Sequence, residues 1–296
     1  MKAIRTPEER FENLPDYSFK PNYLDLEDGL RLHYVDEGDK NGKVVLLLHG
    51  EPSWSYLYRK MIPILADAEF RVIAPDLIGF GKSDKPTEQS DYTYQKHIDW
   101  VKSFITRLDL TGISLFCQDW GGLIGLRIAT EMDERFKRIM ASNTALPIGN
   151  VEMPASFLQW LEFSKSSPKF DIGKVVDKGT VSELTTEEIA AYNAPFPSED
   201  YKAGARIFPS LVPATSDNPE SANNQAAWGK LMQWNKPFLT VFGDSDPIMR
   251  GAEKFFIQVV PGAKDQDHTI VNAGHFSQED QGEDLAKRMI DFILKG

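Results

Sequence analysis

The segment best suited to chemistry is Cys117-Gln118-Asp119-Trp120-Gly121-Gly122, which follows the apolar run 113–116 and precedes a helix-like stretch. A strand, a sharp turn and a helix in this order form a nucleophile elbow, which exposes one side chain above a sheet. Most such elbows expose serine, whereas this one exposes Asp119. Because carboxylates are ionised at neutral pH, this residue can attack without first losing a proton. Its natural target is an sp3 carbon with a leaving group, so we expect an alkyl ester intermediate.

Two further polar positions follow predicted strands. Asp246 lies in Gly243-Asp244-Ser245-Asp246-Pro247, and His275 lies in Asn272-Ala273-Gly274-His275-Phe276. A nucleophile, an acid and a histidine in this chain order are typical of α/β-hydrolases. Asp244 competes with Asp246 for the role of the acid. A third segment, His49-Gly50-Glu51-Pro52, follows another apolar run, and a backbone N–H there could face an oxyanion.

The elements that must position these residues are short apolar runs at 44–48, 71–75, 113–116, 138–142 and 238–242. Each run is typical of a strand that is buried on both faces. Helical segments, such as 94–108, separate the runs, and this alternation predicts a parallel sheet with helices on both sides. The more polar pieces 22–26 and 30–35 could form an antiparallel edge.

The pattern changes between about residues 146 and 218, where prolines punctuate helix-like pieces and no convincing buried strand is found. We interpret residues 146–218 as a helical cap domain inserted into the sheet domain. The sheet domain would then consist of residues 1–145 and 219–296.

The composition indicates which kinds of binding partner to expect. The 296 residues carry 33 basic and 44 acidic side chains, a net charge of −11, with no Lys/Arg-rich run. This argues against nucleic acid and anionic membranes and favours an uncharged ligand. The single cysteine, Cys117, is expected to be buried and unreactive, and no Cys/His cluster has zinc-site spacing. Without a signal core or a membrane-length apolar stretch, we expect a soluble, cytoplasmic monomer.

Several longer motifs extend this pattern over nearly the whole chain: Arg5-Thr6-Pro7, Gly50-Glu51-Pro52-Ser53-Trp54-Ser55-Tyr56-Leu57-Tyr58-Arg59, Asp76-Leu77-Ile78-Gly79-Phe80-Gly81-Lys82-Ser83-Asp84-Lys85-Pro86, Ala194-Pro195-Phe196-Pro197 and Tyr201-Lys202-Ala203-Gly204. Together with the elbow, they resemble the haloalkane dehalogenases of the α/β-hydrolase superfamily, in the subfamily with a cap tryptophan and the acid after the seventh strand. The resemblance implies an α/β-hydrolase fold, with a mostly parallel eight-stranded sheet and an inserted helical cap. The elbow alone is shared with epoxide hydrolases, so the combination of motifs makes the resemblance specific.

The resemblance also implies a first reaction step. Asp119 displaces halide from a haloalkane carbon, and the indole N–H groups of Trp120 and of Trp160 in the cap hold the leaving ion. An indole offers one fixed donor and no acceptor, which suits an anion. The implied partners are a small apolar halogenated substrate, water and a halide ion.

A second step would return the enzyme to its starting state. His275, oriented by Asp246, deprotonates a water that attacks the ester, and family spacing favours Asp246 over Asp244. The backbone N–H groups of Glu51 and Trp120 would stabilise the oxyanion. The products would be a primary alcohol, a halide ion and a proton, and neither a cofactor nor a metal is expected.

An apolar pocket should accompany this site, since a desolvated displacement reaction needs one. The positions that match cavity-facing residues of the family are Leu123, Phe157, Phe208, Pro209, Val212 and Ile248. We interpret Trp54, Trp100, Trp228 and Trp234 as packing residues.

Other functions remain open at this point. An epoxide hydrolase would share the three catalytic residues but would need hydroxyl donors from the cap, where Tyr192 and Tyr201 are candidates. The tryptophan pair favours a leaving group that needs no proton. A fluoroacetate-type dehalogenase would need arginines near the elbow and the Asp76 loop, and that loop has none. A non-catalytic relative of the fold would normally have lost one of the three residues.

Overall fold

An eight-stranded sheet forms the centre of the computed structural model, which describes residues 1–295. The strand order is β10-β9-β8-β7-β4-β5-β3-β2. In chain order the strands are β2 (Asn22–Asp25), β3 (Arg31–Gly38), β4 (Val44–Leu48), β5 (Arg71–Pro75), β7 (Ile113–Gln118), β8 (Phe136–Ser142), β9 (Phe238–Gly243) and β10 (Thr269–Val271). Two short strands, β1 (Ala3–Ile4) and β6 (Lys85–Pro86), pair separately.

The central strands are parallel, and their sequences explain why. Every residue of β4, β7 and β9 is buried, as expected for apolar strands that helices cover on both faces. Leu46 of β4, for example, lies opposite both Ile73 of β5 and Leu115 of β7. The more polar strands β2 and β3 pair antiparallel with each other, and β3 pairs antiparallel with β5. The predicted parallel sheet and its antiparallel edge are therefore confirmed.

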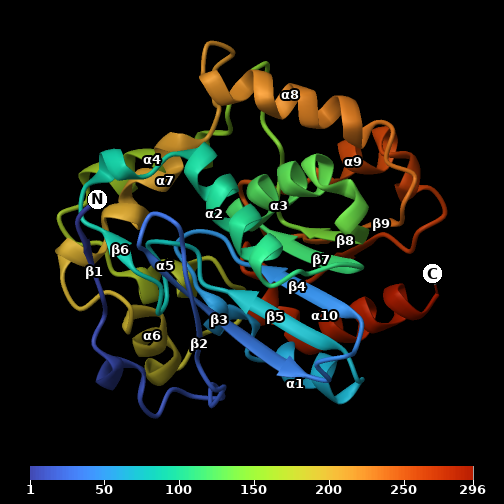
Figure 1. Cartoon of the computed structure of the whole chain (residues 1–296). Coiled ribbons are helices and arrows are strands. Elements are labelled where there is room, and N and C mark those ends of the chain that lie inside the picture. Colours follow the sequence, from blue (N-terminus) through green and yellow to red (C-terminus); the bar gives the residue numbers. More distant parts are fainter. Residues whose placement is uncertain (296) are drawn as a thin grey trace.

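Helices cover both faces of this sheet. On one face lie α2, α3 and α8, which contact one another in sequence, and on the other lie α1 and α10 (Figure 1). Their bounds are α1 (Ile62–Asp67), α2 (Tyr94–Arg107), α3 (Trp120–Glu131), α8 (Pro219–Leu231), α9 (Glu253–Val259) and α10 (Ser277–Leu294). Helix α2 matches the predicted segment 94–108, and the Thr93 side chain caps its N-terminus by accepting a hydrogen bond from the Lys96 N–H.

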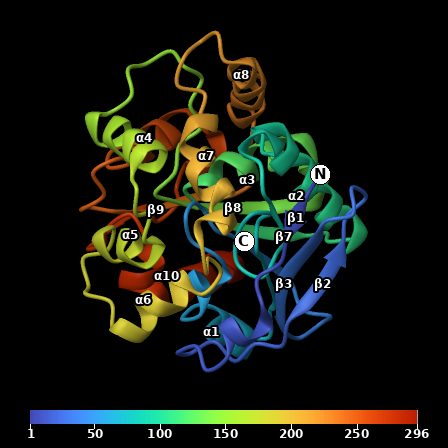
Figure 2. The ribbon, with the colours of Figure 1, turned by 90° about the vertical axis from the view of Figure 1, so that its left-hand side faces the viewer.

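The segment between β8 and α8 adds a group of helices at one end of the sheet (Figures 1 and 2). These are α4 (Ala155–Ser166), α5 (Ile172–Lys178), α6 (Thr186–Asn193) and α7 (Ala203–Leu211), which contact one another as the pairs α4–α7 and α5–α6. Thr185 and Glu188 form a capping box at the start of α6. We propose that residues 146–218 form the cap domain on the main domain of residues 1–145 and 219–296.

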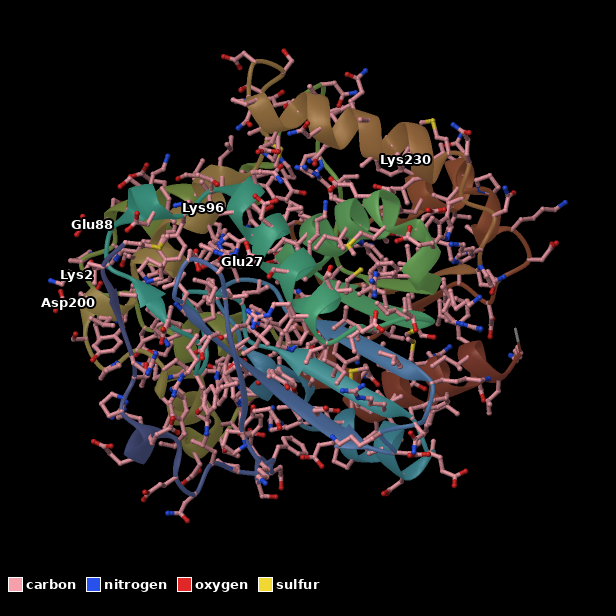
Figure 3. All side chains as sticks on the ribbon, viewed as in Figure 1. Lys2, Glu27, Glu88, Lys96, Asp200 and Lys230 are labelled. Atoms are coloured by element: carbon pink, nitrogen blue, oxygen red, sulfur yellow. The ribbon has the colours of Figure 1, made fainter. Side chains whose placement is uncertain are left out.

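The outside of the molecule carries charged side chains. Figure 3 shows Lys2, Glu88 and Asp200 at its outer edge, and all three are exposed. Cys117 lies in β7 and is buried, as expected from its position in the elbow. Among the helices of residues 1–295, none is both long and apolar enough to cross a membrane.

Candidate active site

Asp119 occupies a strained turn between β7 and α3. Its φ of 51° and ψ of −127° lie outside the regions that non-glycine residues usually adopt, a strain that persists only where the surroundings enforce it. Helix α3 starts at the next residue and approaches β4 very closely. A side chain at Gly121 would collide with the carbonyl oxygen of Leu48, so glycine is required there. The sequence thus builds the elbow that was predicted.

The carboxylate of Asp119 is held between two segments. Its Oδ2 accepts a hydrogen bond of 2.8 Å from the backbone N–H of Glu51, and its Oδ1 lies 3.4 Å from Nε2 of His275. Trp120 is the first residue of α3, so its backbone N–H has no acceptor within the helix. The N–H of Glu51 and that of Trp120 therefore flank the turn in which Asp119 sits, although only the former bonds to the carboxylate here.

His275 connects Asp119 to Asp246. Nδ1 of His275 lies 2.8 Å from Oδ2 of Asp246, which is almost completely buried. Burial lowers the pKa of His275, but the carboxylates of Asp246 and Asp119 outweigh it and raise this pKa well above its ordinary value. The rival acid, Asp244, is exposed and accepts a hydrogen bond from its neighbour Ser245.

Asn143, which the sequence analysis did not single out, supports Asp246. Its Nδ2 donates to Oδ2 of Asp246 at 2.8 Å, and its Oδ1 accepts from the backbone N–H of Gly243 at 2.9 Å. Burial raises the pKa of Asp246, and His275, Asn143 and the N–H of Ile248 more than offset this, so the net pKa is far below its usual range. Asn143 directly follows β8, and a polar residue at the carboxyl end of a parallel strand is the signal that could have identified it.

The loop that contains Glu51 is fixed by His49. The backbone N–H of Leu77 donates to Nε2 of His49, so Nδ1 carries the proton and donates to the Gly50 carbonyl at 2.8 Å. His49 is fully buried, and burial lowers its pKa. It is therefore a neutral residue that packs and forms hydrogen bonds, and it holds the N–H of Glu51 beside Asp119.

A cavity of about 1520 Å³ adjoins the elbow. Asp119, His275, Asp246 and Glu51 line it, and so do these predicted pocket and halide residues: Trp120, Leu123, Phe157, Trp160, Pro209, Val212 and Ile248. Phe208 does not line the cavity, so the prediction that it faces the pocket is wrong. It is fully buried behind the site, with its ring 4.8 Å from the ring of Trp120 and 4.4 Å from that of His97. Phe208 and Pro209 are adjacent on helix α7, so their side chains point in different directions.

Within residues 1–295, three tryptophans line the cavity, and their indole N–H groups have different surroundings. The indole N–H of Trp228 bonds to the carbonyl oxygen of Leu146 at 2.7 Å and is therefore engaged. Trp120 starts α3 directly beside Asp119, and Trp160 lies in the inserted helix α4. The structure thus brings both predicted halide-binding tryptophans to the cavity that holds Asp119.

The two tyrosines considered as hydroxyl donors, Tyr192 and Tyr201, lie elsewhere. Tyr192 is fully buried and donates its hydroxyl to Glu279, and within residues 1–295 neither Tyr192 nor Tyr201 lines the cavity. A pair of tyrosine donors for an alkoxide leaving group is therefore not found at this site.

Several known proteins are similar to this chain over nearly its full length. Residues 43–281 match the family model of the alpha/beta hydrolase fold. A haloalkane dehalogenase of Psychrobacter cryohalolentis is 56% identical and covers 99% of this chain and 98% of its own length. One of Mycobacterium marinum is 48% identical and covers 99% of this chain and all of its own length.

Among solved structures, a haloalkane dehalogenase from Paraglaciecola agarilytica NO2, described as tetrameric, superposes with a TM-score of 0.91. It is 38% identical, and the match covers 97% of each chain. The elbow, the apolar cavity and these full-length similarities show that the chain belongs to the haloalkane dehalogenases, hydrolases of carbon–halogen bonds with the alpha/beta hydrolase fold.

Proposed function

We propose that Asp119 is the nucleophile and forms a covalent alkyl ester with the substrate. The observation that carries this proposal is that the Asp119 carboxylate lines an apolar cavity. It sits in a strained backbone turn that the surrounding structure must hold in place. One carboxylate oxygen attacks the halogenated carbon, the new C–O bond forms, and the halide leaves with the bonding electron pair. The oxygen held by the Glu51 N–H stays in place and later becomes the oxyanion.

In the second step His275 acts as the general base. Its Nδ1–H points to Asp246, so Nε2 is free to take a proton from water while the water oxygen attacks the ester carbon of Asp119. The tetrahedral oxyanion is stabilised by the N–H of Glu51 and by that of Trp120. Its collapse breaks the ester bond between the Asp119 carboxyl carbon and the alkyl oxygen, and that oxygen takes the proton held by His275 and leaves as the alcohol. Asp119 loses the second proton of the water and is a carboxylate again, so one haloalkane and one water give one primary alcohol, one halide ion and one proton.

Trp120 and Trp160 are the proposed ligands of the leaving halide. Both line the cavity with Asp119, and each indole supplies a single N–H donor to an anion. An epoxide hydrolase, the second candidate, needs hydroxyl donors near the nucleophile, and the positions of Tyr192 and Tyr201 disfavour it. The proposed substrates are therefore neutral, apolar haloalkanes.

A substrate panel tests this function. Purified protein is mixed with chloro-, bromo- and iodoalkanes and with styrene oxide, and free halide and pH are followed. We expect one halide and one proton per alcohol formed, and no diol from styrene oxide. Diol formation without halide release from any haloalkane would contradict the proposal.

Two expectations from the sequence concern the whole protein. The expected monomer finds no support in the comparisons, because the Paraglaciecola relative is described as tetrameric. The cytoplasmic location stays a prediction.

A further inference from the structure

The side chain of Glu51 has no role in the reaction described above, which uses only its backbone N–H. It is 4% exposed, it lines the cavity, and its Oε1 has no hydrogen-bond partner among residues 1–295. The backbone that carries it is held in place, because the N–H of Glu51 bonds to Asp119. Buried polar atoms without a partner are rare in folded proteins, and a buried carboxylate with one unpaired oxygen is unfavourable unless it is protonated or meets a ligand.

Neighbouring charged groups shift the pKa of the Glu51 carboxyl in opposite directions. Burial and the neighbouring carboxylate of Asp119 raise the pKa of Glu51 well above its usual range, while His275 and the indole of Trp160 partly oppose them. Asp246 faces the same cavity but is engaged by His275. The other charged side chains along the cavity come from the inserted segment: Glu152, Lys169, Asp171, Lys174 and Lys178.

The indole N–H of Trp160 can therefore interact with either of two anions, the Glu51 carboxylate and the halide. This N–H favours the ionised form of Glu51, and in the proposed function the same N–H holds the halide. An ionised Glu51 would compete with the halide for this donor and would also repel the halide in an apolar cavity that already contains Asp119. Protonation of Glu51 removes both effects.

We propose that Glu51 couples halide binding to pH: its side chain is protonated while a halide occupies the site, and its ionisation expels the halide. Binding of a halide to the ionised form takes up one proton from solvent, and release returns that proton. This inference rests on the proposed halide site, and it makes Glu51 a positioning residue that acts through Trp160.

The test measures bromide affinity by quenching of tryptophan fluorescence between pH 5.5 and 9.5. Because His275 also titrates near the site, a His275→Phe protein is compared with a His275→Phe/Glu51→Gln protein. We expect the bromide dissociation constant of the first to rise with pH, approaching about tenfold per unit above the Glu51 pKa, as a one-proton linkage requires. The double variant should change by less than about twofold, since glutamine keeps the shape and cannot ionise.

A matched control is Glu152→Gln, which removes an exposed carboxyl on the same cavity and should leave the pH profile unchanged. Calorimetry of bromide binding to the unmodified protein, in buffers with different ionisation heats, should show proton uptake that rises towards one per bromide with pH.

The possible results separate the two proposals. Quenching with the same pH dependence in both variants, or no proton uptake by the unmodified protein at any pH, would overturn the role of Glu51. Absence of bromide binding at every pH would instead overturn the proposed halide site.

Discussion

The charge of His275 controls the second half of the proposed reaction, because an imidazolium cannot accept a proton from water. In the free enzyme, burial lowers the pKa of His275, and Asp246 and Asp119 raise it to a net value well above the ordinary one. Alkylation neutralises Asp119, so the pKa of His275 should fall in the ester intermediate. The carboxylate of Asp246 still raises this pKa there. The base is therefore active above this pKa and is lost as the pH falls through it.

Rapid-quench measurements between pH 5.5 and 9.5 test this dependence. Ester hydrolysis should slow about tenfold per pH unit below the pKa of the base, whereas alkylation needs no base and should not slow as the pH falls through that pKa. Alkylation that follows the same pH profile as hydrolysis would show that His275 acts in the first step as well.

Trp160 is the residue whose proposed role is easiest to separate from packing. Trp160→Phe keeps the aromatic ring in α4 but removes the N–H. Loss of one donor of this kind typically costs roughly 2.7–4 kcal/mol of transition-state stabilisation, so we expect kcat/KM for 1-bromobutane to fall by at least about a hundredfold. Trp228→Phe, which loses a donor already bonded to Leu146, is the control and should retain dehalogenation. Unchanged activity of Trp160→Phe would place the second halide donor elsewhere.

At the scale of elements, a buried charge cluster joins helix α6 to α10 and to the segment that contains Arg59 and Lys60. Glu279 at the start of α10 is almost fully buried and accepts hydrogen bonds from Arg59, from Lys60 and from Tyr192 of α6. Arg59 also bonds to Glu188 of α6 at 2.6 Å. Since three donors converge on it, Glu279 connects α10 both to α6 and to the segment of Arg59 and Lys60.

Glu279→Gln should therefore lower the free energy of unfolding by about 3–5 kcal/mol, because it leaves the buried Arg59 charge without its main partner. Glu188→Gln is the matched control. It keeps the capping box and lies nearer the surface, so its cost should stay below about 1 kcal/mol. Urea unfolding measures both, and equal losses would mean that Glu279 does not dominate the cluster.

Local sequence rules predict the elements well and their mutual contacts less well. The apolar runs predicted the central strands, and Asp119 could be placed in an elbow because strand, turn and glycine signals are adjacent in the chain. Asn143 was missed because its contact with Asp246 joins residues that are 103 positions apart. Phe208 was misplaced because a rotation of α7 by about 100°, the angle between neighbouring residues of a helix, decides whether a side chain faces the cavity or the core.

At the scale of the whole molecule, the net charge of −11 should select against anionic substrates. We expect kcat/KM for a neutral bromoalkane to change by less than about twofold between 20 and about 300 mM sodium sulfate, because no charge is attracted or repelled. Bromoacetate should be a much poorer substrate and should improve as salt screens the repulsion. A preference for bromoacetate at low salt would contradict the proposed substrate class.

The covalent role of Asp119 is the central claim, and a single-turnover measurement tests it most directly. In His275→Phe, alkylation should proceed and ester hydrolysis should stop, because only the second step needs a base. Mixed with 1-bromobutane, this variant should release about one bromide per active site. Its intact mass should rise by one butyl group, and peptide mapping should find that group on Asp119. An Asp119→Ala/His275→Phe protein should show neither the burst nor the adduct. If His275→Phe binds bromide but releases none from 1-bromobutane and gains no butyl group, Asp119 is not the nucleophile.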